Sequence, residues 1–113
     1  MDTLAACFPD LLSALVAELE AVGNFELSEQ LRASFVRVVT FDRDSRAGII
    51  ALEPPQTLRS KVEDSFVGGS KGVRGITVGR AYLEINGFGR IVAIEIIGPS
   101  DDLAKAMISH VRG

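Results

Sequence analysis

The sequence predicts an α+β fold in which N-terminal helices precede an antiparallel sheet of four to five strands, and a C-terminal helix follows the sheet. Apolar residues recur at helical spacing in the first 33 residues and again after residue 100, whereas between residues 34 and 99 many of them alternate along the chain. The 113 residues are 47% hydrophobic, which is enough to bury a core. We therefore expect a single domain over residues 1–113.

The first clear helix is expected over residues 9–22. Pro9 suits its first turn, Asp10 complements the positive end of the helix dipole, and Gly23 is a natural stop. Its apolar stripe consists of Leu11, Leu12, Leu15, Val16, Leu19 and Val22. Asn24 can cap a second, shorter helix to about residue 33, which would complete an acidic helical segment over residues 1–33.

A strand at residues 34–42 and a return strand at 47–53 are expected next, joined by a polar turn and ended by Pro54. Alternation along the first strand places Phe35, Val39 and Phe41 on one face and Val36 and Val38 on the other. Because both faces are largely apolar, we expect this strand to be central in a sheet that extends over residues 34–99.

Residues 54–75 are expected to form a long loop, followed by the strongest hairpin signal in the chain: a strand to Ile85, a glycine-rich turn at 86–89 and a return strand. The core face of this hairpin is predicted to hold Ala81, Leu83, Ile85, Val92, Ile94 and Ile96. The other face would hold Tyr82, Glu84, Ile91, Ala93 and Glu95. A four-residue loop would also set Arg80 opposite Glu95 as an ion pair.

The last helix is expected over residues 100–112. Ser100 is its N-cap, and Asp101 and Asp102 lie in its first turn. Its apolar face is predicted to consist of Leu103, Ala106, Met107, His110 and Val111.

Two stretches, at about 35–53 and 76–100, resemble a small bacterial family of domains of unknown function. Its members carry a hairpin of the type YD…D..YI.L and a later strand of the type D..G.IVGIEIL.AS. The matching positions here are Phe41-Asp42, Ile49–Leu52, Gly89–Val92 and Ile94–Ile97. The acidic helical N-terminus, the 54–75 insertion and the C-terminal helix depart from the family. The resemblance implies a compact sheet and supplies no catalytic residue.

The titratable residues form no recognisable catalytic motif, so we expect no enzyme activity, no cofactor and no metal. His110 is the single histidine and Cys7 the single cysteine, too few for a typical zinc site. We interpret His110 as a helix-end residue and Cys7 as a small buried thiol. Asp42 and Asp44 share a turn but lack the EF-hand pattern.

The same reasoning bears on nucleic acid, membrane and compartment. The segment GGSKGVRG at 68–75 matches neither common phosphate-binding loop, and a net charge of −3 argues against a nucleic-acid partner. No apolar run approaches the ~18 residues that cross a bilayer. One cysteine and no secretion signal predict a cytoplasmic protein.

Charge is distributed unevenly along the chain. Residues 1–31 hold six acids and no Lys or Arg, whereas residues 32–90 hold ten bases and six acids, so the net charges are −6 and +4. The candidate partner-binding residues are Glu18, Glu20, Glu26 and Glu29. Either the basic sheet neutralises this acidic segment internally, or the segment docks a basic partner.

Small size, acidity and a lack of catalysts are similar in general character to bacterial immunity proteins and antitoxins, which would make the partner a basic, nuclease-type toxin. A self-associating structural or regulatory domain is the first alternative, because the apolar faces of strand 34–42 leave surface for a homodimer. The second alternative is a small-ligand binder or enzyme that uses Glu84 and Glu95 on one sheet face.

Overall fold

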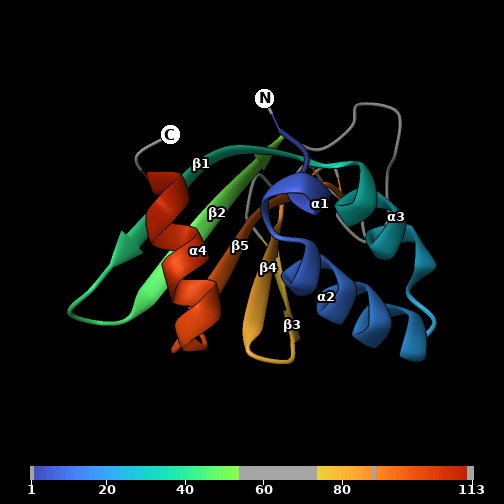
Figure 1. Ribbon diagram of the computed structural model, residues 1–113. Helices are drawn as coiled ribbons and strands as arrows, with labels where there is room; N and C mark the ends of the chain where they lie inside the picture. The colour runs from blue at the N-terminus through green and yellow to red at the C-terminus, as the bar shows by residue number, and fades with distance from the viewer. Residues whose placement is uncertain (1, 54–73, 88, 112–113) are drawn as a thin grey trace.

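A computed structural model describes residues 2–53, 74–87 and 89–111, and it confirms the α+β class (Figure 1). The elements are α1 (Leu4–Cys7), α2 (Pro9–Ala21), α3 (Phe25–Ala33), β1 (Phe35–Asp42), β2 (Ala47–Glu53), β3 (Arg74–Val78), β4 (Ala81–Ile85), β5 (Ile91–Ile97) and α4 (Asp101–Val111). The five strands are arranged in the order β1-β2-β5-β4-β3, and each neighbouring pair is antiparallel. Within the described ranges, no helix is long and apolar enough to cross a membrane. Most of the loop expected at 54–75 lies outside the described residues.

Local capping signals explain where the helices begin. The Asn24 side chain accepts a hydrogen bond from the Leu27 N–H at 3.3 Å, and the Ser100 hydroxyl accepts one from Leu103 at 3.2 Å, as expected for N-caps. Helix α1 was not predicted from the sequence. It is a single turn, too short to show periodicity, and the Thr3 side chain caps it.

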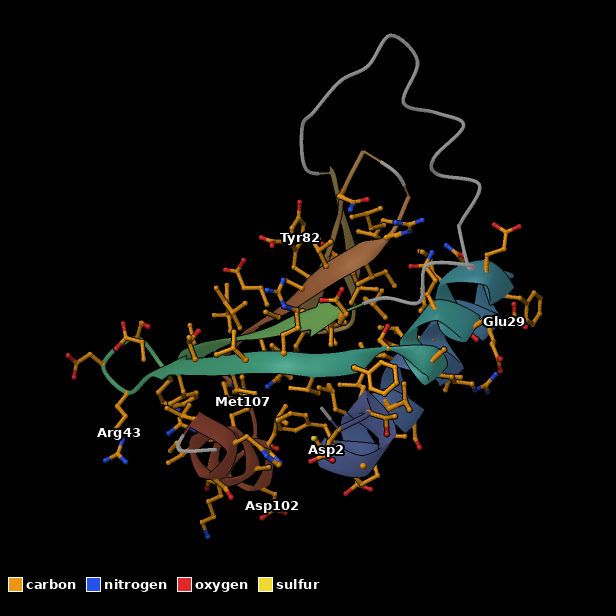
Figure 2. The ribbon with its side chains drawn as sticks, turned by 90° about the horizontal axis from the view of Figure 1, so that it is seen from above. Asp2, Glu29, Arg43, Tyr82, Asp102 and Met107 are labelled. Carbon is orange, nitrogen blue, oxygen red and sulfur yellow. The ribbon has the colours of Figure 1, made fainter. Side chains whose placement is uncertain are left out.

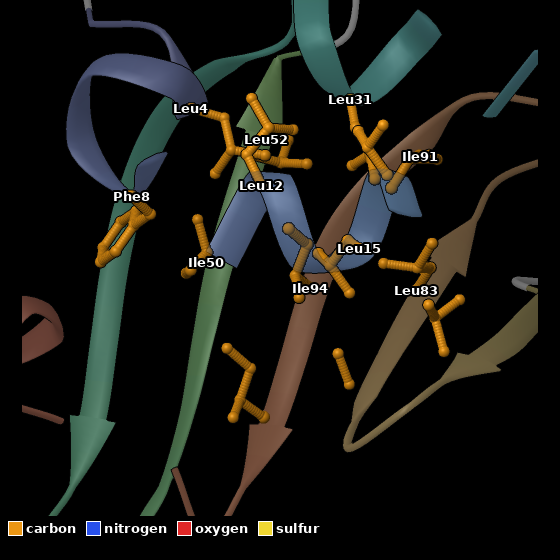
Figure 3. Packing of buried hydrophobic residues seen from close by; sticks show 14 of the residues in the cluster. Leu4, Phe8, Leu12, Leu15, Leu31, Ile50, Leu52, Leu83, Ile91 and Ile94 are labelled. Carbon is orange, nitrogen blue, oxygen red and sulfur yellow. The ribbon is translucent and has the colours of Figure 1, made fainter. Parts of the chain in front are cut away.

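The helices lie on one face of the sheet, with α4 over β1 and α2 on the side of β3 (Figure 1). All the elements contribute to one buried apolar cluster between the two layers (Figure 3). Its most deeply buried side chains are Leu4, Leu19, Leu27, Leu31, Ile50, Leu52, Leu83, Ile85, Ile91, Ile94 and Met107. The cluster leaves the other face of the sheet outside the core.

Strand β1 differs from its prediction in two ways. It lies at the edge of the described sheet rather than in the middle. A bulge between Val36 and Val38 also makes Arg37 an extra residue, so Val36 joins Val39 on the core side and Phe35 faces out. The apolar residues on the outward face of β1 are therefore exposed. They do not indicate a strand that is buried on both faces.

The second hairpin also departs from the expected register. The chain turns at Gly79, whose φ is +59°, so the expected single strand at 75–85 is divided into β3 and β4. A second bulge, at Val92, then pairs Ile85 with Ile91 and Tyr82 with Glu95. The expected pairing of Arg80 with Glu95 is therefore wrong, and Ile91 rather than Val92 is fully buried.

A glycine lets α4 approach β2 closely. A Cβ atom built on Gly48 would overlap the Met107 side chain and would lie 3.1 Å from the Phe41 ring. Met107 is fully buried between α4 and the sheet (Figure 2). The bare backbone at Gly48 therefore sets how deeply this methionine can pack.

A buried glutamine joins the helices to the sheet. The Gln30 side chain of α3 is fully buried. Its amide nitrogen donates to the Gly89 carbonyl at 2.8 Å, and its amide oxygen accepts from the Ile91 N–H at 3.0 Å. One side chain thus satisfies two backbone groups on either side of Arg90, where β5 begins. We call this pair of hydrogen bonds the Gln30 clamp.

Replacing Gln30 tests the clamp. We expect Gln30→Ala to lower the free energy of unfolding by about 2–4 kcal/mol, because it leaves buried polar groups without partners and opens a cavity. Gln30→Leu restores most of the volume without the hydrogen bonds, and Glu29→Ala is an exposed control on the same helix. Urea denaturation measures all three. A Gln30→Leu variant as stable as the wild type would contradict a role for the hydrogen bonds.

Candidate functional site

The described helices leave the other face of the sheet uncovered (Figure 1). Strand pairing places its residues in rows that run across the sheet. One row consists of Thr40, Ile49, Glu95, Tyr82 and Thr77, and the next of Val38, Ala51, Ala93, Glu84 and Gly75. Asp42, Ala47 and Ile97 form a third, shorter row. We call these three rows the open sheet face.

Large apolar side chains are exposed on this face. Ile97 is 65% exposed, Val38 56% and Ile49 41%, each from a different strand. Tyr82, at 39%, points away from the helical layer (Figure 2). Its ring occupies the space above Gly75, where a Cβ atom would overlap it. The absence of a side chain at Gly75 thus leaves room for the aromatic ring.

The open sheet face also carries two carboxylates on adjacent strands. Tyr82 pairs with Glu95 and Glu84 with Ala93, so the two glutamates are diagonal neighbours. Both are partly buried, and no ion pair joins either one to a described residue. Two shallow hollows border Glu95, and Glu84 lines neither of them. The two glutamates therefore do not meet in a shared hollow of the kind expected for an acid/base pair.

The four glutamates predicted to bind a partner lie in the helical layer, two on α2 and two on α3. Glu20 faces α3: it forms an ion pair with Arg32 at 3.2 Å and accepts a hydrogen bond from Ser28 at 3.0 Å. Glu18 lies on another side of α2, with its carboxylate against Gly79. Glu26 is in the first turn of α3, and Glu29 is exposed (Figure 2). Glu18 and Glu20 thus lie on different sides of α2, whereas Glu26 and Glu29, three residues apart, lie on the same side of α3.

Three ion pairs link described residues, and they show how the charge asymmetry is arranged. They are Glu20 with Arg32, Arg37 with Glu53, and Arg46 with Asp101. Only the first includes an acid of residues 1–31, and it joins two helices. Among the pairs seen, none joins the acidic helices to a base on the sheet.

His110 and Asp42, which were considered as catalytic or metal-binding residues, have contacts that serve the fold. The His110 ring packs edge-on against Phe8, with 4.9 Å between the ring centroids. The Asp42 carboxylate accepts a hydrogen bond from the Asp44 N–H at 2.9 Å, and this bond lowers the pKa of Asp42. In the part of the chain that the structure describes, no three His, Cys, Asp or Glu side chains gather as metal ligands would. Most of the 68–75 segment lies outside the described residues.

From the sequence, the apolar faces of strand 34–42 were proposed as a homodimer surface, but Ile49, Tyr82 and Ile97 were not proposed as part of the same site. The signal was present, because strand 34–42 is apolar on both faces. Because the described helices all pack on the other face of the sheet (Figure 1), that pattern produces an exposed surface rather than a second core.

Comparison of this chain with protein-family models, with curated proteins and with solved structures finds no match. The resemblance to a family of domains of unknown function stays a prediction.

Cys7 provides a test of the described surroundings of α1. Burial, and to a smaller extent the Asp2 carboxylate, raises the pKa of the Cys7 thiol. We expect the pH at which iodoacetamide alkylates Cys7 at half its maximal rate to be higher in the folded protein than in urea. Asp2→Asn should lower the folded midpoint only in part, because burial is the larger cause, and Glu29→Gln should leave it unchanged. Equal midpoints in the folded and unfolded protein would contradict this account.

Proposed function

We propose that this chain is a non-catalytic protein-binding module of the immunity-protein or antitoxin kind, and that it binds a basic partner through the open sheet face. The observation that carries the proposal is the combination on this face of exposed apolar side chains with two carboxylates. Each of these features requires something specific of the partner.

The apolar part supplies a reason to bind. Val38, Ile49 and Ile97 come from three adjacent strands and leave apolar surface in contact with water. Contiguous apolar patches of this kind on soluble domains mark interaction sites, because covering them releases water. A sheet face whose hollows are shallow fits a protein surface better than a small ligand, which needs a concave site.

The carboxylates define the charge of the partner. A partner that covers the open sheet face removes water from Glu84 and Glu95, which costs free energy unless a cation replaces the water. A partner with Lys or Arg inside an apolar surface meets this requirement, and the match fixes its orientation. A nuclease-type toxin is a basic protein of this description.

A second copy of the chain meets the requirement less well. The three rows of the open sheet face contain no Lys or Arg, so a homodimer packed face to face would add two more carboxylates. This argument favours a different protein as the partner over the self-associating alternative.

The acidic helices have a separate role in this proposal. Glu18, Glu26 and Glu29 lie outside the open sheet face, so they would steer a basic partner toward the molecule over a distance. Glu20 is paired with Arg32 and accepts a hydrogen bond from Ser28, which would reduce its contribution.

The first experiment co-expresses the chain with the product of the gene immediately upstream in the source genome, and it measures complex formation and growth. We expect a stoichiometric complex and rescue of growth.

Two double variants of equal charge then locate the interface. Glu84→Gln with Glu95→Gln should weaken binding by about tenfold or more, because it removes the charge pairing in the interface. Glu18→Gln with Glu29→Gln should mainly slow association. The reverse pattern would place the interface on the helices, and no complex would remove the proposal.

A second pair of variants tests the apolar part. Ile97→Asp should weaken the complex, whereas Val22→Asp, at a 78% exposed position outside the face, should not.

Tyr82 is the single tyrosine, so 3-fluorotyrosine labels this face at one position. Its ¹⁹F resonance should shift when the partner binds. Sedimentation of the chain alone, over a range of concentrations, tests the self-associating alternative, and a stable dimer that shifts the same resonance would replace the proposed partner with a second copy.

A further inference from the structure

A groove runs between α2 and α4, on the opposite side of the sheet from the open sheet face. It consists of two adjoining hollows of about 370 Å³ and 460 Å³. Both are lined by Leu11 and Ala14 of α2 and by Ser100 and Leu103 at the start of α4. The two hollows share these four residues, so they lie next to each other along α2.

The lining of the groove is mostly apolar. Phe8 lies at one end, beside Ala106, and the core strands supply Ala81 and Ile96 at the other. Ala81 and Ile96 belong to neighbouring strands of the sheet, β4 and β5. The groove is therefore a gap in the helical layer that reaches down to the sheet.

The rim of the groove is acidic. Asp10 and Asp102 flank one hollow, Glu18 flanks the other, and all three are exposed. Arg80 is the one basic residue among the described residues that line either hollow. An occupant with positive charge along both edges of an apolar strip complements this arrangement.

The dimensions indicate the form of the occupant. The α2 residues on the groove run from Pro9 to Glu18. Ten residues of helix extend over about 15 Å, or nearly three turns. A helix of similar length, laid beside α2, would complete the layer in the way that neighbouring helices of a layer pack on a sheet.

We propose that this groove is a docking site for a cationic amphipathic helix of about three turns from another protein. Its apolar residues, spaced at i, i+3, i+4 and i+7, would contact Leu11, Leu103 and the strand floor. Its Lys or Arg side chains would meet Asp10, Asp102 and Glu18 at the rim. The site does not depend on the function proposed for the open sheet face, because the two surfaces lie on opposite sides of the sheet.

The probe is a fluorescein-labelled 14-residue peptide with leucine on one helical face and lysine on the other, followed by fluorescence anisotropy. We expect saturable binding to the wild-type chain, and none of a peptide in which glutamate replaces lysine. Ala14→Trp places a large ring in the groove, whereas Ala17→Trp adds the same ring to an exposed position of α2 outside it. The first should weaken binding by about tenfold, equivalent to ~1.4 kcal/mol, and the second by less than about twofold.

Two double variants with equal changes of charge test the contribution of the rim carboxylates to peptide binding. Asp10→Asn with Asp102→Asn should weaken binding and flatten its dependence on salt, while Glu29→Gln with Asp44→Asn, an equal change of charge elsewhere, should not. Thermal unfolding confirms that each variant is folded. The ¹⁹F resonance of labelled Tyr82 should not shift with this peptide, which separates the groove from the open sheet face. Absence of saturable binding, equal affinity of Ala14→Trp and Ala17→Trp, or a shift of the Tyr82 resonance would each overturn the proposal.

Discussion

The Gln30 clamp is the interaction on which the arrangement of the molecule depends. One amide bonds the Gly89 carbonyl and the Ile91 N–H, so it fixes the start of β5 against α3. The bulge at Val92 follows directly after this point, and Ile85 pairs with Ile91. A shift of one residue in this register would exchange the two faces of β5. The Gln30 clamp therefore helps to hold the register that decides which side chains reach the open sheet face.

Burial on one side explains why the two candidate surfaces exist. The described helices all pack on a single face, so the chain forms one core and leaves the other face of its strands outside that core. The open sheet face is the consequence on one side. On the other side, α2 and α4 are held apart by what each one packs against, and the groove remains between them.

The two surfaces combine apolar area with negative charge in different ways. On the open sheet face the carboxylates of Glu84 and Glu95 lie within the apolar rows, so any partner that covers it must bring cations into the interface. At the groove the carboxylates lie on the rim, where they remain hydrated and favour association without a large cost of desolvation. Of these carboxylates, Asp10 and Glu18 belong to the acidic segment at residues 1–31, whereas Glu84 and Glu95 lie outside it.

By itself the sequence determined the features that depend on residues close together in the chain. The positions of α2, α3 and α4, the Asn24 and Ser100 caps and the β1–β2 hairpin all follow from periodicity, capping and turn chemistry within a few residues. The absence of the common zinc-binding, EF-hand and phosphate-binding motifs can likewise be read directly from the sequence. The carboxylates Glu84 and Glu95 could be assigned to one sheet face because alternation is local.

Only the tertiary structure decided the features that depend on distant partners. Gln30 finds its acceptor and donor 59 and 61 residues away, and nothing in its neighbourhood indicates this. The edge position of β1 depends on which strands pair. The bulges at Arg37 and Val92 depend on whether an extra residue in the strand improves the packing of the core. The groove exists because α2 and α4, far apart in sequence, pack over different strands. Long-range packing makes these choices, because local preferences differ too little between the alternatives to make them.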